Sequence, residues 1–304
     1  MLYNFDKALL LPPKGIVDVV LDTDAYNEID DQFAIAYLLR SKEKLNTVAI
    51  YAAPFFNNRS TGPADGMQKS YDEIFKILDL CGEASIKDSV YRGATAYLPD
   101  EKNPVDSPAA RDLAQRAMSY SPEKPLYVLA IGAITNIASA LLLNPEIKDR
   151  IVVVWLGGHA HHWNDTLEFN MKQDIPAARV VMGSGVPFVQ LPCNGVVSEL
   201  RITVPELEFA LVGKNPLADY LARNTIAYGK KHNQDGLWSK VIWDVTVISW
   251  FFNDGERFLR TRITNVRLPS LVGIYEDPVD IPMCYVYGLY RDRIFRDLFA
   301  KILL

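Results

Sequence analysis

Short, strongly apolar runs recur along the chain, and segments of a different periodicity separate them. The runs are rich in β-branched residues, and in most of them both alternating sets of side chains are apolar. Strands that are apolar on both faces are typical of a parallel sheet that helices cover on both sides. The predicted strands are Ile16–Leu21, Thr47–Ala53, Leu126–Ile131, Ile151–Leu156 and Val186–Leu191.

The segments between these runs place apolar residues three or four positions apart, which is the spacing of one helix face. This pattern predicts helices over 31–40, 66–80 and 134–141. Toward the end of the sequence, 262–288 predicts additional strands, and Arg291–Leu303 predicts a closing helix. Strands that alternate with helices indicate an α/β fold.

The sequence of 304 residues contains no internal repeat and no Gly/Ser-rich linker. A chain of this length can form one large α/β domain or two ordinary ones. Because no linker marks a boundary, we expect a single domain over residues 1–304, with two domains as the alternative. The predicted fold class is α/β, with a mostly parallel central β-sheet flanked by helices and extra strands near the C-terminus.

The composition excludes some classes of binding partner for this protein. The net charge is −5, and the Lys and Arg residues are scattered, so a nucleic-acid partner is not expected, because non-specific binding to nucleic acid needs a basic face. The three cysteines lie far apart with no CxxC pair, which favours a reducing compartment. We find no signal-peptide pattern and no stretch near the ~18 apolar residues of a membrane span. The composition predicts a soluble cytoplasmic protein without a membrane partner.

Four aspartates lie within ten residues where the first predicted strand meets the first predicted helix. Asp22 and Asp24 alternate at the strand end, and Asp30 and Asp31 open the helix. The helix-opening pair has a purely structural alternative, because carboxylates at a helix N-terminus stabilise the helix. Four crowded carboxylates, however, repel one another unless a cation neutralises them. Hard oxygen ligands select Ca²⁺ or Mg²⁺ over zinc, so this junction predicts a divalent metal site.

The sequence DTDAYNEIDD that carries these aspartates resembles the DxDxxxDD signature of nucleoside hydrolases, with two extra residues in the loop. Two further segments are similar to conserved parts of that family. LAIGAITNIASALLL resembles its strand–GxLTN[IV]A–helix segment, and a Gly-Gly turn followed by EFN, an aspartate and AAR resembles its ribose-binding loop. The resemblance therefore covers nearly the whole chain.

The resemblance implies a calcium ion held by Asp24, Asp31, Asp244 and the main-chain carbonyl of Ile131. It implies that Asp24 is also the general base that activates a metal-bound water, with Asp22 behind the ligands, where it accepts backbone N–H bonds. From the residues alone, Ile131 can equally be the last core residue of a strand. Asp244 can equally be a helix cap.

The same resemblance implies which residues contact the sugar and the nucleobase of the substrate. Asp30 is expected to bind the 2′-hydroxyl, and Glu168 and Asn170 are expected to bind the ribose hydroxyls. The side chain of Asp244 is expected to meet a ribose hydroxyl as well as the ion. Asn164 is expected on the 5′-hydroxyl side. Trp243 occupies a position where some relatives carry a histidine proton donor, and it is expected to stack on the nucleobase. The alternative for Trp243 is a core or interface aromatic.

Three histidines, His159, His161 and His162, lie in the loop before the EFN motif. Imidazole clusters prefer transition metals, so a solvated or pocket-rim loop is the favoured interpretation of this motif, rather than a calcium site. One of the three histidines is also a candidate general acid for the leaving group. After the second predicted strand, Asn57 and Asn58 are further candidates for contacts to the substrate.

The sequence thus predicts calcium-dependent hydrolysis of the N-glycosidic bond of ribonucleosides to ribose and free base. The expected partner is a small nucleoside, and the resemblance implies a homo-oligomer, either a dimer or a tetramer. Three alternatives stay open. They are a Mg²⁺-dependent phosphatase of the haloacid-dehalogenase type with Asp22 as nucleophile, a nucleoside-binding relative without turnover, and an enzyme for a larger ribosyl conjugate.

Overall fold

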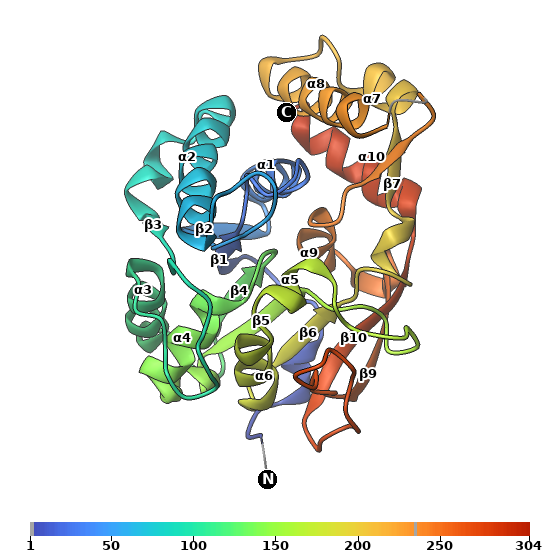
Figure 1. The fold of residues 1–304 in the computed structure, drawn as a ribbon. Coiled ribbons are helices and arrows are strands. Elements are labelled where there is room, and N and C mark those ends of the chain that lie inside the picture. Colours follow the sequence, from blue (N-terminus) through green and yellow to red (C-terminus); the bar gives the residue numbers. More distant parts are fainter. Residues whose placement is uncertain (1–2, 234–235) are drawn as a thin grey trace.

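The computed structural model describes residues 3–233 and 236–304. An eight-stranded sheet with the order β3-β2-β1-β4-β5-β6-β10-β9 forms its centre (Figure 1). Seven of these strands are parallel, and β9 runs antiparallel to β10 at one edge. The strands are β1 (Val17–Thr23), β2 (Leu45–Ala52), β3 (Val90–Arg92), β4 (Leu126–Ala130), β5 (Ile151–Leu156), β6 (Phe188–Leu191), β9 (Leu259–Asn265) and β10 (Pro282–Leu289). The predicted mostly parallel sheet with extra strands near the C-terminus is confirmed.

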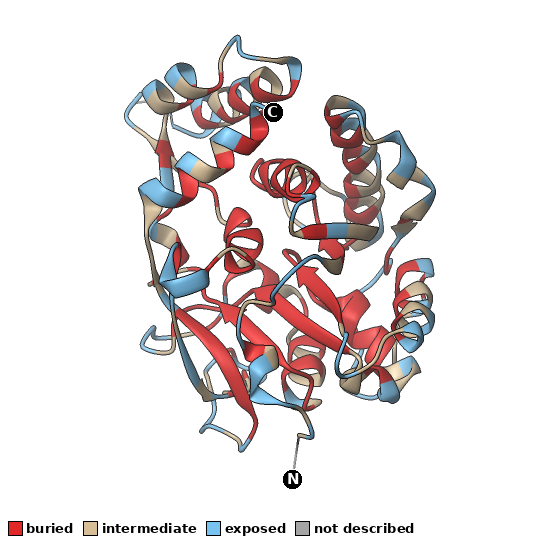
Figure 2. Cartoon of the chain, turned by 180° about the vertical axis from the view of Figure 1, so that it is seen from behind, coloured by how far each residue is buried: buried red, intermediate tan, exposed pale blue. Residues whose placement is uncertain are grey.

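Helices cover both faces of this sheet, and each face has its own apolar core. Along β1, Val19 and Leu21 pack into one core and Val20 packs into the other, because successive side chains point to opposite faces. Figure 2 shows that the strands are mostly buried and that exposed residues gather on the outer surfaces of the helices. The first core contains α1 (Asp31–Leu39), α2 (Pro63–Cys81), α9 (Val245–Trp250) and α10 (Arg291–Ile302), and the second contains α3 (Pro108–Arg116), α4 (Thr135–Leu143) and α6 (Ile175–Gly183).

A smaller group of elements extends one side of the molecule. A two-stranded antiparallel sheet joins β7 (Arg201–Thr203) to β8 (Ser239–Val241), and it accompanies α7 (Val204–Ala210) and α8 (Pro216–His232). Helix α8 contacts α2, and α7 and α8 lie near α10 in Figure 1. The short helix α5 (Phe169–Gln173) follows the loop after β5. Within 3–233 and 236–304, no helix is long and apolar enough to cross a membrane.

The order of the strands decides where a ligand can bind. From β1 the chain continues to β2 and β3 on one side, and it then returns to place β4 on the other side of β1. Open parallel sheets bind ligands outside the carboxyl ends of the strands at such a reversal of strand order. Asp24 follows the end of β1, and Ile131 follows the end of β4, so both lie at this point.

Candidate active site

A cavity of about 580 Å³ opens at the carboxyl edge of the parallel strands. Five adjacent strands contribute to its lining through the residues that follow them. Asn57 follows β2, Asp24 follows β1, Ile131 follows β4, His159 follows β5 and Asn194 follows β6. Among the predicted site residues and further candidates, those that line the cavity are Asp24, Asp30, Asp31, Asn57, Asn58, Ile131, His159, Glu168, Asn170, Trp243 and Asp244.

The carboxylates converge on the floor of this cavity. Asp30, Asp31 and Asp244 each offer an oxygen atom, and these atoms lie within 4.8 Å of one another. Asp24 is buried in the same cavity, and neither of its carboxylate oxygens has a hydrogen-bond partner among the described residues. Buried polar atoms are nearly always paired, so this set of oxygens fits a hard cation.

The raised pKa values of these carboxylates also indicate a cation at this cluster. Burial raises the pKa of Asp31 to about 8, and the nearby charge of Asp30 adds to this effect. Burial also raises the pKa of Asp24 well above its ordinary value, and the charges of Asp31 and Asp30 raise it further. The pKa of Asp244 is raised by burial and by the same neighbours. These groups cannot all ionise near neutral pH without a positive charge among them.

The structure also tests the alternative that these aspartates are helix caps. Asp30 and Asp244 occupy the N-cap positions of α1 and α9, but neither side chain makes a capping hydrogen bond. Asp30 instead accepts the backbone N–H of Trp243 at 3.0 Å, and Asp31 accepts the Thr23 hydroxyl at 2.5 Å. These aspartates line the cavity, and helix capping does not explain their positions.

Asp22 lies behind the cluster and is fully buried. One of its oxygens accepts the Asn136 side-chain amide at 2.7 Å, and the oxygen of that amide accepts the Ala94 backbone N–H at 2.8 Å. The expected backbone N–H partners of the Asp22 carboxylate are therefore replaced by a side chain of α4. Because Asp22 does not line the cavity, it is not placed to act as the nucleophile that the phosphatase alternative requires.

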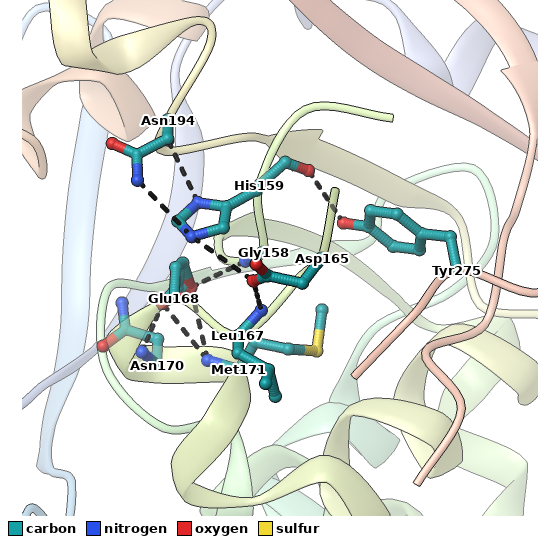
Figure 3. A network of polar contacts seen from close by, with 9 residues as sticks. All are labelled: Gly158, His159, Asp165, Leu167, Glu168, Asn170, Met171, Asn194 and Tyr275. Carbon is teal, nitrogen blue, oxygen red and sulfur yellow. Dashed lines mark hydrogen bonds and ion pairs between the residues drawn. The ribbon is translucent and has the colours of Figure 1, made fainter. Parts of the chain in front are cut away.

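The EFN segment forms a second polar wall (Figure 3). Glu168 caps α5 and accepts the backbone N–H groups of Gly158, Asn170 and Met171, with the Gly158 bond at 2.7 Å. Burial raises the pKa of Glu168 to about 7. The Asn170 amide donates to the carbonyl of Ile131 at 3.2 Å, which ties this wall to the metal-ligating carbonyl that the resemblance predicts.

The loop between β5 and α5 differs from expectation at one residue. Asn164 is exposed and is absent from the cavity lining, whereas His159 is buried and lines it. His161 packs between Tyr275 and Tyr285, away from the cavity, and His162 is exposed. The pocket-rim interpretation of this loop therefore fits His159 alone among the three histidines.

The longer loop between the two aspartate pairs has a defined shape. Asn27 accepts the Asn57 side-chain amide at 2.6 Å, and the carbonyl of Glu28 accepts the Arg59 guanidinium at 2.7 Å. The Glu28 carboxylate forms an ion pair with Lys240, whose pKa is raised by the charges of Asp30 and Glu28 against the opposing effect of burial. Asn27, Glu28 and Lys240 were not predicted from the sequence, since each bridges segments that are distant along the chain.

Comparisons with known proteins agree with this arrangement. A family model described as inosine-uridine preferring nucleoside hydrolase matches residues 19–272. A pyrimidine-specific ribonucleoside hydrolase of Escherichia coli O139:H28 is 28% identical over 184 residues, which are 57% of this chain and 58% of the relative. The corresponding enzyme of Salmonella paratyphi A is 28% identical over 160 residues, and the match covers 50% of each chain. The chain thus spans about half the length of the curated relatives it matches.

Two solved structures have the same fold. An inosine-guanosine nucleoside hydrolase has a TM-score of 0.74 at 18% identity, and the match covers 94% of this chain and 98% of the other. A purine-preferring ribonucleoside hydrolase from Gardnerella vaginalis has a TM-score of 0.71 at 21% identity, with coverage of 94% and 98%. The family match covers well over half of the sequence. The chain therefore belongs to the inosine-uridine preferring nucleoside hydrolase family.

Proposed function

We propose that this chain hydrolyses the N-glycosidic bond of ribonucleosides with the help of a bound calcium ion. The observation that carries the proposal is the Asp24 carboxylate. It is buried in the same cavity as Asp30, Asp31 and Asp244, and both of its oxygens lack a protein partner among the described residues. Family membership supports the reaction class, and the oxygen-only donor set supports calcium.

Asp24, Asp31, Asp244 and the Ile131 carbonyl would hold the ion. When bound, it would supply positive charge that lowers the pKa of a nearby water and orients the ribose diol. Asp30 also belongs to the three carboxylates whose oxygens converge in the cavity. One of its oxygens is occupied by the Trp243 backbone N–H, so the other remains for the 2′-hydroxyl.

Asp24 acts as the general base in this proposal. Beside the ion its carboxylate is ionised, and it takes a proton from the water that attacks C1′. The C1′–N bond breaks with its electron pair on the nucleobase, which takes up a proton from solvent as it leaves, so positive charge develops on the sugar ring in the transition state. The buried carboxylates around the ring stabilise that charge more strongly in the transition state than in the ground state.

The base lies against the aromatic side of the cavity. Trp243 is half-buried and lines the cavity together with Tyr228, whose hydroxyl donates to Glu28 at 3.2 Å. A flat nucleobase suits such a surface, because stacked aromatic rings attract one another beyond simple area burial. We propose stacking as the role of Trp243.

A panel of purine and pyrimidine ribonucleosides, assayed for released reducing sugar with calcium or with excess chelator, tests the proposal. We expect turnover of at least one nucleoside, with loss of turnover in chelator and recovery when calcium is restored. Activity that survives complete removal of calcium would overturn the metal role. Calorimetric binding of nucleosides without release of sugar would instead identify a binding protein. Light scattering would measure the expected dimer or tetramer.

A further inference from the structure

A second cavity, of about 410 Å³, lies between the loop that follows β5 and the strand pair β9 and β10. His159 of this loop lines the active-site cavity, whereas His161 and His162 line the second one. The other lining residues are Val196, Arg262, Thr264, Arg267, Tyr285 and Tyr287. None of these residues lines the active-site cavity, so the second cavity is separate from the proposed site of hydrolysis.

Two arginines make the second cavity basic. Arg262 and Arg267 line it, and no Asp or Glu of 3–233 and 236–304 does. Neither guanidinium forms an ion pair within the described part of the chain. The arginines that do form ion pairs are Arg111, Arg116, Arg179, Arg223, Arg257 and Arg291. Each guanidinium offers five N–H donors and stays charged, so this cavity offers two positive groups to an anion.

The His161 ring lies in the field of the same two arginines. Burial lowers the pKa of His161 to about 4, and the charges of Arg267 and Arg262 lower it further, against a hydrogen bond with Gln190 that raises it. The ring is therefore neutral near pH 7. It packs against Tyr285 with 4.2 Å between the ring centroids, and its backbone N–H donates to the Tyr285 hydroxyl at 3.0 Å. His161 thus forms part of the wall, and the arginines supply the charge.

The strand pair holds Arg262 in a defined position. Arg262 and Tyr285 are direct partners in the register of β9 and β10. The guanidinium carbon of Arg262 lies 5.2 Å from the centroid of the Tyr285 ring and 5.6 Å from that of Tyr287. Thr264, two residues further along β9, lies on the same face and adds a hydroxyl to the lining. A guanidinium held over aromatic rings keeps its N–H edges for a ligand and loses less freedom when one binds.

The charge and the donors of this cavity suit phosphate. Two guanidinium groups balance the charge of a phosphate dianion, whereas a single carboxylate would leave one of them without a partner. The planar fork of arginine matches two phosphate oxygens at once. A phosphate group fills only part of the cavity, so room remains beside Tyr285 and Tyr287 for a small organic group joined to the phosphate.

We propose that the second cavity binds a dianionic phosphate group through Arg262 and Arg267. The group is carried either by inorganic phosphate or by a small phosphate monoester. This inference goes beyond the proposed hydrolysis of ribonucleosides and does not depend on it, because the two cavities share no lining residue.

Isothermal titration calorimetry of the full chain near neutral pH tests the inference, with inorganic phosphate and phenyl phosphate as separate probes. The buffer contains no added calcium, so that neither probe binds through that ion. Phenyl phosphate has no hydroxyl groups that could imitate a ribose. We expect saturable binding of at least one probe at one site per chain. Tighter binding of phenyl phosphate would identify a monoester as the ligand, and tighter binding of inorganic phosphate would identify the free ion.

Variants connect this binding to the two arginines. Arg262→Gln and Arg267→Gln should each weaken binding about 10–100-fold, the size of one hydrogen bond to a charged group, and the double variant should not bind measurably. Arg262→Lys keeps the charge but loses the fork, so its affinity should lie between those of the wild type and Arg262→Gln. Because neither arginine lines the active-site cavity, nucleoside turnover should stay unchanged in all of these variants.

The matched control is Arg260→Gln, which removes an exposed charge of the same strand from outside the cavity. Its affinity for both probes should equal that of the wild type. Equal binding by the wild type and the double variant, or no saturable binding by the wild type, would overturn the inference. The arginines would then only protect the edge of the sheet from pairing. Loss of turnover in the wild type would instead contradict the proposed hydrolysis and leave the phosphate site unaffected.

Discussion

The Asp24 carboxylate combines features that rarely occur together in a folded chain. It is buried, it is surrounded by other acids, and its oxygens have no partner among the described residues. Asp24→Ala should therefore lower nucleoside turnover by about 10²–10⁴-fold, the usual contribution of a general base. Circular dichroism should show an unchanged fold, because the substitution also removes charge repulsion. Asp280→Ala, at an exposed position, is the control and should keep wild-type turnover. Near-normal turnover by Asp24→Ala would refute the role of Asp24.

The placement of residues in the cavity was predictable from sequence where a short motif contains all the partners. Asp24 and Asp31 fall on one strand–helix junction, so their shared cavity follows from local geometry. That His159 and not Asn164 lines the cavity was not predictable, because it depends on the path of an irregular loop. The role of Asn136 was also missed, although its Thr-Asn pair belongs to the segment that carries the family resemblance.

At the scale of elements, the turn between β4 and α4 has to pass very close to the end of β1. A Cβ atom on Gly132 would lie 3.1 Å from the Asp24 carboxyl carbon and 3.1 Å from the Ala53 side chain. Gly132→Ala should push the Asp24 carboxylate aside by a few tenths of an ångström. We expect a loss of about tenfold in kcat, since a misplacement of 1 Å can cost about a hundredfold.

Gly62→Ala is the matched control for this prediction, because a Cβ atom at Gly62 meets nothing within 4 Å. Steady-state kinetics and thermal unfolding of the two variants should be compared. The expected result is a fall in kcat for Gly132→Ala alone, with little change in melting temperature for either variant. Equal kcat values would show that the turn tolerates the methyl group.

The sheet strands were predictable because nearly every side chain in β4 and β5 is apolar and buried. Their predicted bounds agree with the structure to within one residue. In contrast, β3, β7 and β8 have three residues each, too few for a periodic pattern to emerge. The helix α8 was also missed, although its Asn215 cap and following proline are a typical helix start.

For the molecule as a whole, the buried acids make stability depend on protons and on calcium together. Burial raises the pKa values of Asp22 to about 7, of Asp31 to about 8 and of Glu168 to about 7. Between the ordinary pKa values near 4 and these raised values, the folded chain binds more protons than the unfolded chain. The metal-free chain should therefore be most stable below about pH 4 with respect to these groups, and should lose that contribution as the pH rises toward 8.

Bound calcium should neutralise the carboxylates that lose their protons as the pH rises, and it should thereby restore the stability of the folded chain. At pH 8 the ligands ionise when the ion binds, so a hundredfold excess of calcium over its Kd should add about 2.7 kcal/mol to the free energy of unfolding. At pH 5 protons compete for the same carboxylates, and the gain should nearly vanish. Melting temperatures measured with calcium and with chelator at both pH values test this expectation without an activity assay. Magnesium at equal concentration is the control, and its smaller effect would reflect its reluctance to shed water. An equal rise in melting temperature at pH 5 and pH 8 would mean that calcium binds elsewhere than among these buried acids.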